Sequence, residues 1–517
     1  MIPYFNTSGP CIPGKHYMLS PEHRLRHVLR LVDEEKYFTI HAGRQTGKTT
    51  MLRWIADHFN RGNRYRVLWV DVETARDIDD PAEAIPTMLR CFDDAIEWAG
   101  LTEEMTLPWK QWVEDPESAM LLALRHLSRE SDRPLVVLFD EADSLIGRTM
   151  VTFLTQLRKG YLARDRVPFP YSVALVGQRQ VRDYVFRDED RRAVAWLGST
   201  SPFNITAEAA TLRMFTRDEV AELLDQHTEK TGQRFSQEAV EHLFYLSQGH
   251  PWLVNAIADQ VVNRDVEDRS VEVTKDHIEA AKETIIVERR SHIDSLLARL
   301  REERVKRIID PMIAGERATY ENLDDDAAYV KGLGLVVERG GTWQVANPVY
   351  REVILRTLTY SQQMQIANEP AWYVTKDGKL EMRKLMEAWQ KFWRKDGHLA
   401  AEGFGYRESG PHLMLMAFLQ RIVNGGGRIE REYGLGRGAL DLLVEFGGER
   451  HAIEVKVRRH ERSEEKGLKQ LTRYLDHLGS QEGWLVLFDL RKERKWEDKL
   501  FIRDETREGK LIHVVGA

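Results

Sequence analysis

Continuous apolar runs of strand length alternate with helical segments through the first two hundred residues of the chain. The four runs are 37–43, 65–72, 134–143 and 171–179, and polar, glycine or proline residues separate them from the helical segments, as is typical of buried strands. Parallel strands that are joined by helices form a sheet with helices on both faces. The pattern therefore predicts an α/β fold with a parallel sheet in this part of the chain.

Beyond residue 205 the pattern changes several times. A helical region follows, in which Thr216 and Ser236 stand as N-caps before acidic residues. Short helices then precede two strand-like runs joined at Gly340–Gly341, which predicts a winged-helix module. A helix and three strand-like runs between 411 and 489 indicate a second α/β domain. The predicted domains are 1–205, 206–285, 286–365, 366–400 and 401–517: an α/β core, a helical lid, a winged helix, a linker helix and a C-terminal α/β domain.

The composition is that of a globular protein with several domains. The 517 residues exceed what one hydrophobic core holds, and 42% are hydrophobic and 30% charged. The net charge of −7 excludes a uniformly basic nucleic-acid-binding surface. No apolar run approaches the roughly 18 residues of a membrane span, and no secretory signal is found. With two cysteines, Cys11 and Cys91, a cytoplasmic protein without a membrane partner is expected.

The sharpest motif lies between the first strand and the helical run after it. Residues 42–49 read AGRQTGKT, a P-loop pattern with alanine in place of the first glycine. Backbone N–H groups of such a loop bind phosphate, Lys48 neutralises phosphate oxygens, and the Thr49 hydroxyl binds Mg²⁺. Gly47 lets the backbone approach the anion closely. The predicted nucleotide-binding residues are Ala42, Gly43, Arg44, Gln45, Thr46, Gly47, Lys48, Thr49 and Thr50.

An acidic pair ends the third strand. Asp140 and Glu141 follow an apolar run in the Walker B arrangement, in which Asp140 holds the Mg²⁺ shell and Glu141 polarises the attacking water. A helix N-cap is the simpler interpretation of such a pair alone. Arg179, at the end of the fourth strand, would contact the γ-phosphate, and a surface arginine is an equally good interpretation. Together these motifs predict an ATP-binding ATPase.

These segments resemble the AAA-like and STAND/ORC-type P-loop ATPases of prokaryotes over roughly residues 1–360. The matching stretches are GPCIPGKHYMLSPEHR, AGRQTGKTT, VLFDEAD, the strand-end GQR, SPFNITAEAATLRMFTRDEV, QGHPWLVNAIADQ and GLGLVVERGGTWQVANPVYREVI. The resemblance implies that Gly249, His250 and Pro251 lie near the nucleotide and communicate its state to the lid. A turn between two helices is the alternative, because glycine and proline punctuate helices in any case.

Two features of this region leave assembly and partners open. An arginine finger cannot be placed among Arg191, Arg192 and Arg217, so formation of a homo-oligomer stays open. The implied winged helix could read DNA or couple domains. Because Asp324–Asp326 would repel phosphate beside its basic cluster, a protein–protein role is slightly favoured, and a protein activator is one such partner.

A second constellation lies in the C-terminal domain. Residues two apart on a strand share a face, so Glu454 and Lys456 point the same way. If Asp441 comes alongside, two carboxylates and an ammonium converge, as metal-dependent phosphodiester hydrolysis requires. Asp441 and Glu454 would bind Mg²⁺, and Lys456 would orient the nucleophile or stabilise the developing charge. The alternative is a solvated strand face with a cross-strand ion pair.

These residues resemble the PD-(D/E)xK nuclease superfamily over about residues 400–517. Gln470 and Tyr474 match the QxxxY helix motif of RecB-like members, and residues four apart share a helix face. Glu408 is the implied first glutamate, with Glu430 and Glu432 as rivals. No proline precedes Asp441, which is a minor departure from the superfamily pattern.

The leading hypothesis is an ATPase whose nucleotide state controls a Mg²⁺-dependent nuclease, in defence against foreign DNA by analogy with similar chains. Its cofactors are ATP and Mg²⁺, and its substrate is nucleic acid, with DNA preferred. The alternative hypothesis is an ATP-dependent switch or scaffold that binds nucleic acid through an inactive nuclease-like domain. DNA-binding regulation through the winged helix is a third.

Overall fold

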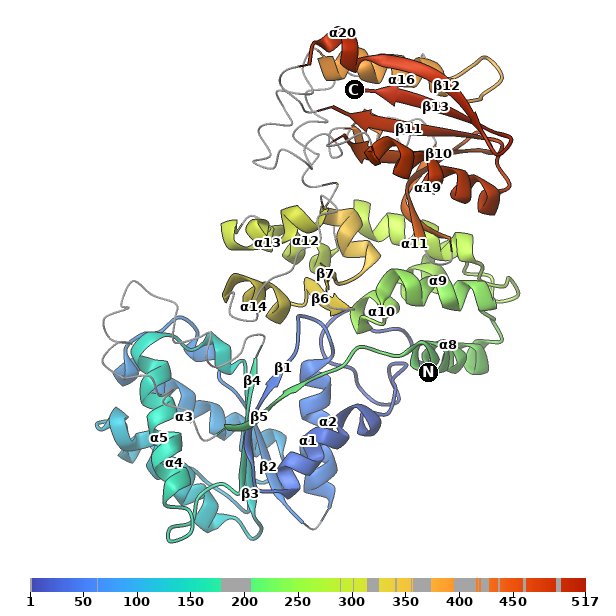
Figure 1. The fold of residues 1–517 in the computed structure, drawn as a ribbon. Coiled ribbons are helices and arrows are strands. Elements are labelled where there is room, and N and C mark those ends of the chain that lie inside the picture. Colours follow the sequence, from blue (N-terminus) through green and yellow to red (C-terminus); the bar gives the residue numbers. More distant parts are fainter. Residues whose placement is uncertain are drawn as a thin grey trace. The chain divides into compact units, whose positions relative to one another are not determined.

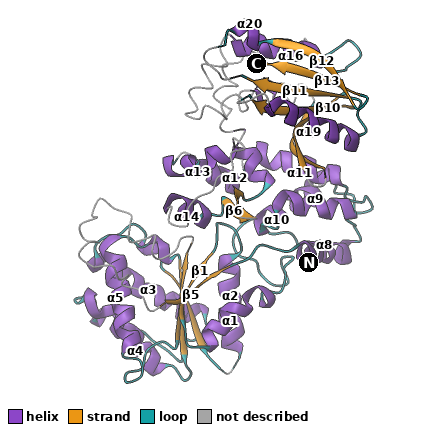
Figure 2. Cartoon of the chain, viewed as in Figure 1, coloured by secondary structure: helices purple, strands orange, loops and turns teal. Residues whose placement is uncertain are grey.

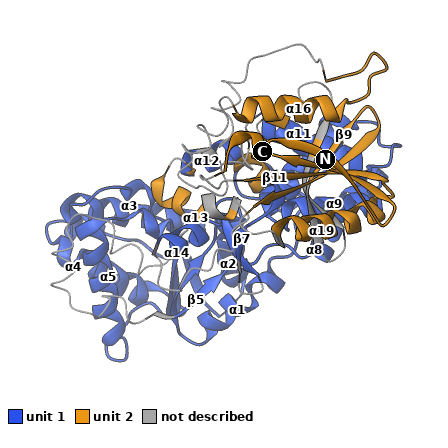
Figure 3. Ribbon diagram, turned by 45° about the horizontal axis from the view of Figure 1, so that its top comes forward, with its two compact units in different colours: residues 1–299, 319–350 blue, residues 300–318, 351–517 orange. Residues whose placement is uncertain are grey.

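The computed structural model describes most of the chain and divides it into two compact units. One unit comprises residues 1–299 and 319–350, and the other comprises 300–318 and 351–517 (Figure 3). The residues outside the description are 1, 63, 178–205, 289, 301, 314–324, 340–341, 355, 357–372, 395–414, 417, 420–426, 436–437, 459–461 and 490–493.

A five-stranded parallel sheet forms the centre of the first unit. Its strands lie in the order β2-β3-β4-β1-β5 (Figure 1), and every neighbouring pair is parallel. The parallel α/β prediction is therefore confirmed. The strands are β1 (Tyr37–His41), β2 (Arg66–Asp71), β3 (Leu135–Asp140), β4 (Ser172–Gly177) and β5 (Thr206–Thr211).

The fifth strand, β5, lies where the sequence predicted a helix. Residues 206–211 fall in the stretch predicted to be helical, yet they form β5, which pairs with β1 at one edge of the sheet. The segment TAEAAT is short and poor in large apolar residues, so it carries no strand signal of its own. Pairing with β1 supplies the hydrogen bonds that decide its conformation.

Helices cover both faces of this sheet (Figures 1 and 2). Alternate residues of each strand enter two separate cores, so that Leu138 packs with α1 and α2 while Phe139 packs with α3, α4 and α5. Burial on both faces explains the continuous apolar runs of β2, β3 and β4. The helices are α1 (Glu22–Asp33), α2 (Lys48–Arg61), α3 (Pro81–Trp98), α4 (Pro116–Glu130) and α5 (Gly147–Leu162).

A helical segment follows β5. Thr216 caps its first helix through a capping box with Glu219, and Ser236 caps the second by accepting a hydrogen bond from the Ala239 N–H, so both predicted N-caps are confirmed. The helices are α8 (Arg217–Thr231), α9 (Gln237–Ser247), α10 (Pro251–Gln260) and α11 (Lys275–Val287), and a π-helical turn, Val261–Asp265, extends α10.

The first unit ends in two helices and a hairpin. They are α12 (Ser291–Arg299), α14 (Asp325–Gly332), β6 (Val336–Arg339) and β7 (Thr342–Val345), and the two strands are antiparallel. The predicted strand-like runs on either side of 340–341 therefore form a hairpin, whereas the winged helix as a module stays a prediction. Helix α13 (Glu303–Ile313) belongs to the second unit.

The second unit contains a six-stranded mixed sheet in the order β12-β13-β11-β10-β9-β8. Strands β10 and β11 are parallel and are connected through α19, whereas β9 is antiparallel to both β8 and β10. The strands are β8 (Arg428–Leu435), β9 (Gly438–Phe446), β10 (Glu449–Val457), β11 (Glu482–Phe488), β12 (Phe501–Arg507) and β13 (Lys510–Gly516). The helices are α16 (Met382–Phe392), α19 (Arg462–Leu478) and the short α20 (Trp496–Lys499).

Helix α16 lies in the segment predicted to be a linker, yet it is part of this unit's core. Trp389 is fully buried, and its ring lies 6.0 Å from that of Phe488 on β11. Gln390 donates hydrogen bonds to the backbone carbonyls of Phe501 and Gly516. The apolar stripe of α16 therefore packs on the sheet and does not serve as a free connection.

Candidate functional site

The loop between β1 and α2 has the backbone of an anion-binding site. Gln45 has φ +57° and Gly47 has φ +89°, and the Thr46 hydroxyl donates to the Gly43 carbonyl at 2.8 Å. Gly47 immediately precedes α2, whose first N–H groups have no partner within the helix. A left-handed glycine next to a helix N-terminus leaves these N–H groups available for a phosphate.

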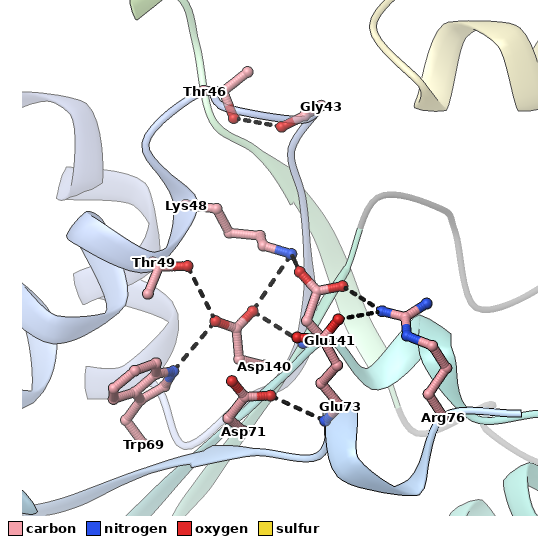
Figure 4. Close-up of polar contacts among 10 residues, drawn as sticks. All are labelled: Gly43, Thr46, Lys48, Thr49, Trp69, Asp71, Glu73, Arg76, Asp140 and Glu141. Atoms are coloured by element: carbon pink, nitrogen blue, oxygen red, sulfur yellow. Dashed lines mark hydrogen bonds and ion pairs between the residues drawn. The ribbon is translucent and has the colours of Figure 1, made fainter. Parts of the chain in front are cut away.

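Lys48 lies among the carboxylates that end β3 (Figure 4). Its Nζ is 2.5 Å from Glu141 Oε1 and 3.4 Å from Asp140 Oδ1. The Thr49 hydroxyl faces Asp140 Oδ2 at 3.4 Å. The structure thus brings Lys48, Thr49, Asp140 and Glu141 together, although they come from segments more than 90 positions apart in the chain.

Burial and charge act against each other at this cluster. Burial raises the pKa of Asp140, which is 2% exposed, and the nearby Lys48 ammonium partly offsets that effect. Burial lowers the pKa of Lys48, but Asp140 and Glu141 outweigh it, so the net shift is upward. Lys48 is therefore held as an ammonium by carboxylates at the point where a phosphate would compete for it.

Two contacts at this cluster were missed by the sequence analysis. The Trp69 indole N–H donates to Asp140 Oδ2 at 3.3 Å, and Arg76 Nη2 lies 3.6 Å from Glu141 Oε2 (Figure 4). Glu141 itself adopts φ +53°, a left-handed conformation, which directs its side chain toward Lys48 and Arg76. Trp69 and Arg76 lie on and just after β2, and neither belongs to a recognisable motif, so only the adjacency of β2 and β3 identifies them.

His250 lies against the P-loop. It is the N-cap of α10, with Pro251 at the first helical position, as the alternative of a turn between helices predicts. The buried ring is also hydrogen-bonded to the backbone of Arg44. Burial lowers the pKa of His250 to about 4, so its imidazole is neutral at pH 7. The segment therefore caps a helix and contacts the predicted nucleotide loop at once.

The segment after α11 also covers the loop. Arg44 Nη1 donates to the Ser295 hydroxyl on α12, and a Cβ built on Gly43 would lie 3.4 Å from the Gly334 Cα. His292 on α12 contacts the Tyr350 hydroxyl through Nε2 at 2.6 Å, and its ring lies 5.0 Å from that of His250. These contacts join the loop, α10 and the residues around the hairpin within one unit.

The remaining predicted nucleotide residues have defined places or lie outside the description. Ala42 is buried and donates its N–H to the Gly177 carbonyl at 3.2 Å. The Thr50 hydroxyl accepts the Cys11 N–H at 2.9 Å, so it anchors the N-terminal segment. Arg179 lies outside the described residues, as do Arg191 and Arg192. Arg217 forms an ion pair with Glu241 at 2.8 Å.

In the second unit, Glu454 and Lys456 lie on the sheet face that α19 covers. Glu454 is fully buried, and Lys456 Nζ lies 2.5 Å from its Oε1. Gln470 on α19 donates to the Tyr474 hydroxyl at 3.1 Å. A Cβ built on Gly467 would lie 3.0 Å from the Lys456 Cγ, so the N-terminal half of α19 passes directly over the lysine.

Two predicted members of this second constellation are less fully described. Asp441 lies on β9, and its side chain is outside the description, as is all of Glu408. The described pairing of β9 with β10 ends at Leu442 opposite Ile453. Among the described residues no group of three His, Cys, Asp or Glu side chains could hold a metal ion.

No helix in the described parts of the chain has both the length and the apolar character to cross a membrane.

Comparisons with known proteins assign most of the chain to a family. A profile described as an AAA-like domain matches residues 15–355, and one described as a domain of unknown function (DUF8371) matches residues 383–492. Among solved structures, the chain is similar to the Walker-type ATPase PABY2304 of Pyrococcus abyssi at 16% identity and a TM-score of 0.47, covering 68% of this chain and 99% of that one.

Two further solved structures are similar over about two thirds of the chain. They are ORC2 of Aeropyrum pernix (14% identity, TM-score 0.38, 66% of this chain and 93% of that one) and the RuvB Holliday junction branch migration motor of Thermotoga maritima (12%, 0.34, 65% and 95%). No curated protein matches the sequence.

Proposed function

The chain belongs to the AAA-like domain family and is an ATP-binding P-loop ATPase; from this premise we propose that it hydrolyses ATP with Mg²⁺ and thereby controls its C-terminal domain. In this proposal the N–H groups of residues 43–49 bind the phosphates, and Lys48 neutralises their oxygens. Asp140 holds the metal shell and Glu141 orients the attacking water. The convergence of Lys48, Thr49, Asp140 and Glu141 carries the proposal.

The residues present fit Mg²⁺. The Thr49 hydroxyl and Asp140 Oδ2 lie 3.4 Å apart, and hard oxygen ligands of this kind, completed by phosphate and water, are what Mg²⁺ uses at nucleotide sites. Thr49 and Asp140 would hold the metal, which would supply charge to neutralise the negative charge that develops on the phosphates. Lys48 would exchange its contact with Glu141 for phosphate oxygens, and Glu141 would then be available to orient a water molecule.

We propose that His250 and Pro251 carry the nucleotide state to the helical segment. The support is the hydrogen bond between the His250 ring and the Arg44 backbone, because any movement of the P-loop alters that bond directly. Since His250 also caps α10, the same movement reaches the helix N-terminus.

For the C-terminal domain, we propose a PD-(D/E)xK nuclease site. Glu454 and Lys456 share the α19-covered face, and Gln470 and Tyr474 lie on α19 itself. The proposal is supported by the β9–β10 pairing, which ends at Leu442 opposite Ile453; one further residue in the same register would put Asp441 opposite Glu454. By analogy with chains of similar architecture, the proposed substrate is DNA and the proposed role is defence against foreign DNA.

One observation favours the alternative, in which this domain binds nucleic acid without cutting it. Glu454 is fully buried and already forms an ion pair with Lys456. A metal ligand needs an open side toward substrate and water, and here α19 covers that side. An inactive domain would serve as a nucleic-acid-binding platform whose exposure the ATPase controls.

A cleavage assay distinguishes the two proposals. Supercoiled plasmid and linear DNA are incubated with Mg²⁺, with and without ATP, using wild type, Asp441→Ala and Lys48→Ala, and Lys159→Ala on α5 as the matched control. Cleavage that Asp441→Ala abolishes supports the nuclease, and its loss in Lys48→Ala supports control by nucleotide. DNA binding without cleavage in every variant supports the platform. Cleavage whose rate changes neither with ATP nor in Lys48→Ala contradicts control by nucleotide.

A further inference from the structure

Trp69 is the side chain on β2 that reaches the carboxylate at the end of β3. Its register partner on β3 is Leu138, and both pack in the core beside α2. From this position the indole N–H donates to Asp140 Oδ2 at 3.3 Å, as Figure 4 shows. Trp69 is 8% exposed, so a donor that lost this acceptor would have little water to replace it.

Neighbouring side chains hold the indole in this orientation. The Arg53 guanidinium lies 5.0 Å from the ring centroid, and the Trp98 ring lies 5.0 Å away at an interplanar angle of 30°. Arg53 follows Thr49 by four residues on α2, so the two share a helix face. The helix that carries the predicted metal-binding hydroxyl therefore also fixes the indole.

The partners of Asp140 fall into two classes. Lys48 and Thr49 contact its carboxylate here, but both are the groups that phosphate and metal would recruit. The Glu141 backbone N–H, at 2.9 Å from Oδ1, and the Trp69 N–H, on Oδ2, have no such competing role. With nucleotide and metal bound, these two donors would still hold the Asp140 carboxylate, one at each oxygen.

We infer that Trp69 is a positioning residue, which orients the Asp140 carboxylate toward the metal of the bound nucleotide. This inference rests on the proposed Mg²⁺-dependent use of ATP. The indole does not touch nucleotide or metal; it acts by stabilising one orientation of a buried carboxylate through a hydrogen bond to a charged acceptor. Its loss should weaken the metal-dependent part of nucleotide binding and leave the metal-independent part in place.

The test compares Trp69→Phe with Trp98→Phe in the full chain. Phenylalanine keeps an aromatic ring and removes the N–H, whereas Trp98, whose ring lies beside that of Trp69, has no described hydrogen bond to a carboxylate at this site. Binding of a fluorescent ATP analogue is measured in EDTA and then across a Mg²⁺ titration. We expect Trp69→Phe to raise the Mg²⁺ concentration for half-maximal enhancement roughly five- to tenfold. Trp98→Phe should stay within about twofold of wild type.

The affinity in EDTA is the internal control for folding. The inference holds if Trp69→Phe binds the analogue in EDTA within about twofold of wild type while its Mg²⁺ requirement rises. It is overturned if the Mg²⁺ requirement equals that of Trp98→Phe, or if affinity falls equally with and without Mg²⁺, which indicates a purely structural role. A wild-type protein whose nucleotide binding ignores Mg²⁺ overturns the proposed function, and this inference with it.

Discussion

Each of the two units contains a lysine paired with a carboxylate, but the chain builds the two pairs in different ways. Lys48 reaches Glu141 across 93 positions, whereas Lys456 reaches Glu454 two positions away on the same strand; both contacts are 2.5 Å. A pair of residues two apart on a strand arises wherever an acid and a base alternate. The Lys48–Glu141 pair joins the start of α2 to the end of β3, so it can form only after the strands of the sheet have paired.

This difference determines how strongly each lysine–carboxylate pair indicates a functional site. In the first unit, Lys48 and Thr49 on α2 and Trp69 on β2 all contact the Asp140 carboxylate at the end of β3. In the second unit, Lys456 donates to Glu454 and to the Val455 carbonyl on its own strand, and the second acid, Asp441, has its side chain outside the description. Distant convergence supports a site more strongly than local pairing does.

The largest expected effect tests the first pair directly. Lys48→Ala should lower the rate of ATP hydrolysis roughly 10²–10³-fold, because it removes a preorganised charge from the phosphate site. Steady-state phosphate release measures the rate, and Lys159→Ala, a lysine exposed on α5, is the matched control. Hydrolysis that persists within tenfold in Lys48→Ala would mean that the Lys48–Glu141 pair is structural.

The second pair should respond mainly in stability. Lys456→Ala removes an ion-pair contact from the fully buried Glu454, which should cost about 3 kcal/mol of local unfolding free energy. Hydrogen exchange of β10 peptides measures the change. Lys469→Ala, which breaks an exposed pair with Glu465 at 3.6 Å, should cost under about 1 kcal/mol. Equal protection of β10 in the two variants would contradict the expected penalty.

Gly249, next to the N-cap residue of α10, packs against the backbone of Phe215. Gly249 has φ +74°, and a Cβ there would lie 1.9 Å from the Phe215 carbonyl oxygen, so Gly249→Ala should destabilise the first unit by about 3 kcal/mol. Gly232→Ala is the matched control: it has φ +81° with no atom within 4 Å of the built Cβ, and should cost about 1 kcal/mol. Thermal unfolding compares the two, and a Gly249→Ala no worse than Gly232→Ala would contradict the close contact.

The buried His250 predicts a pH dependence of the first unit's stability. Its pKa is lowered to about 4 by burial, against about 6.5 for an unfolded histidine, so the unfolded chain binds the extra proton first. The stability that the neutral His250 imidazole contributes is fully present above pH 6.5. It is lost as pH falls toward 4, which lowers the free energy of unfolding by up to about 3 kcal/mol. Urea unfolding across this window should show a flatter profile for His250→Asn than for wild type. Exposed His23→Asn is the control, and matching slopes in wild type and His250→Asn would contradict the expectation.

The smallest expected effect concerns Arg76. Its guanidinium lies 3.6 Å from Glu141 Oε2 and is 44% exposed, so Arg76→Ala should change ATP hydrolysis by no more than about threefold, as exposed ion pairs do. Phosphate release measures this, beside Arg61→Ala, which removes a still more exposed pair. A loss beyond tenfold would show that Arg76 holds Glu141 in place and belongs to the site proper.

The sequence by itself determined the features that depend on neighbours along the chain. Four continuous apolar runs predicted β1 to β4 because strands buried on both faces need apolar side chains at every position. The P-loop and the acidic pair were recognisable because phosphate binding fixes residue types at set spacings. The N-caps at Thr216 and Ser236 were recognisable for the same local reason.

Tertiary structure alone decided which distant residues meet. Segment 206–211 is a strand because β1 offers an open edge, and α16 is part of a core because the sheet presents an apolar face to it. Trp69 reaches Asp140 across 71 positions, and His250 reaches the Arg44 backbone across about 200. No local spacing encodes such contacts, because the pairing of strands and the packing of helices bring these residues together only when the chain has folded.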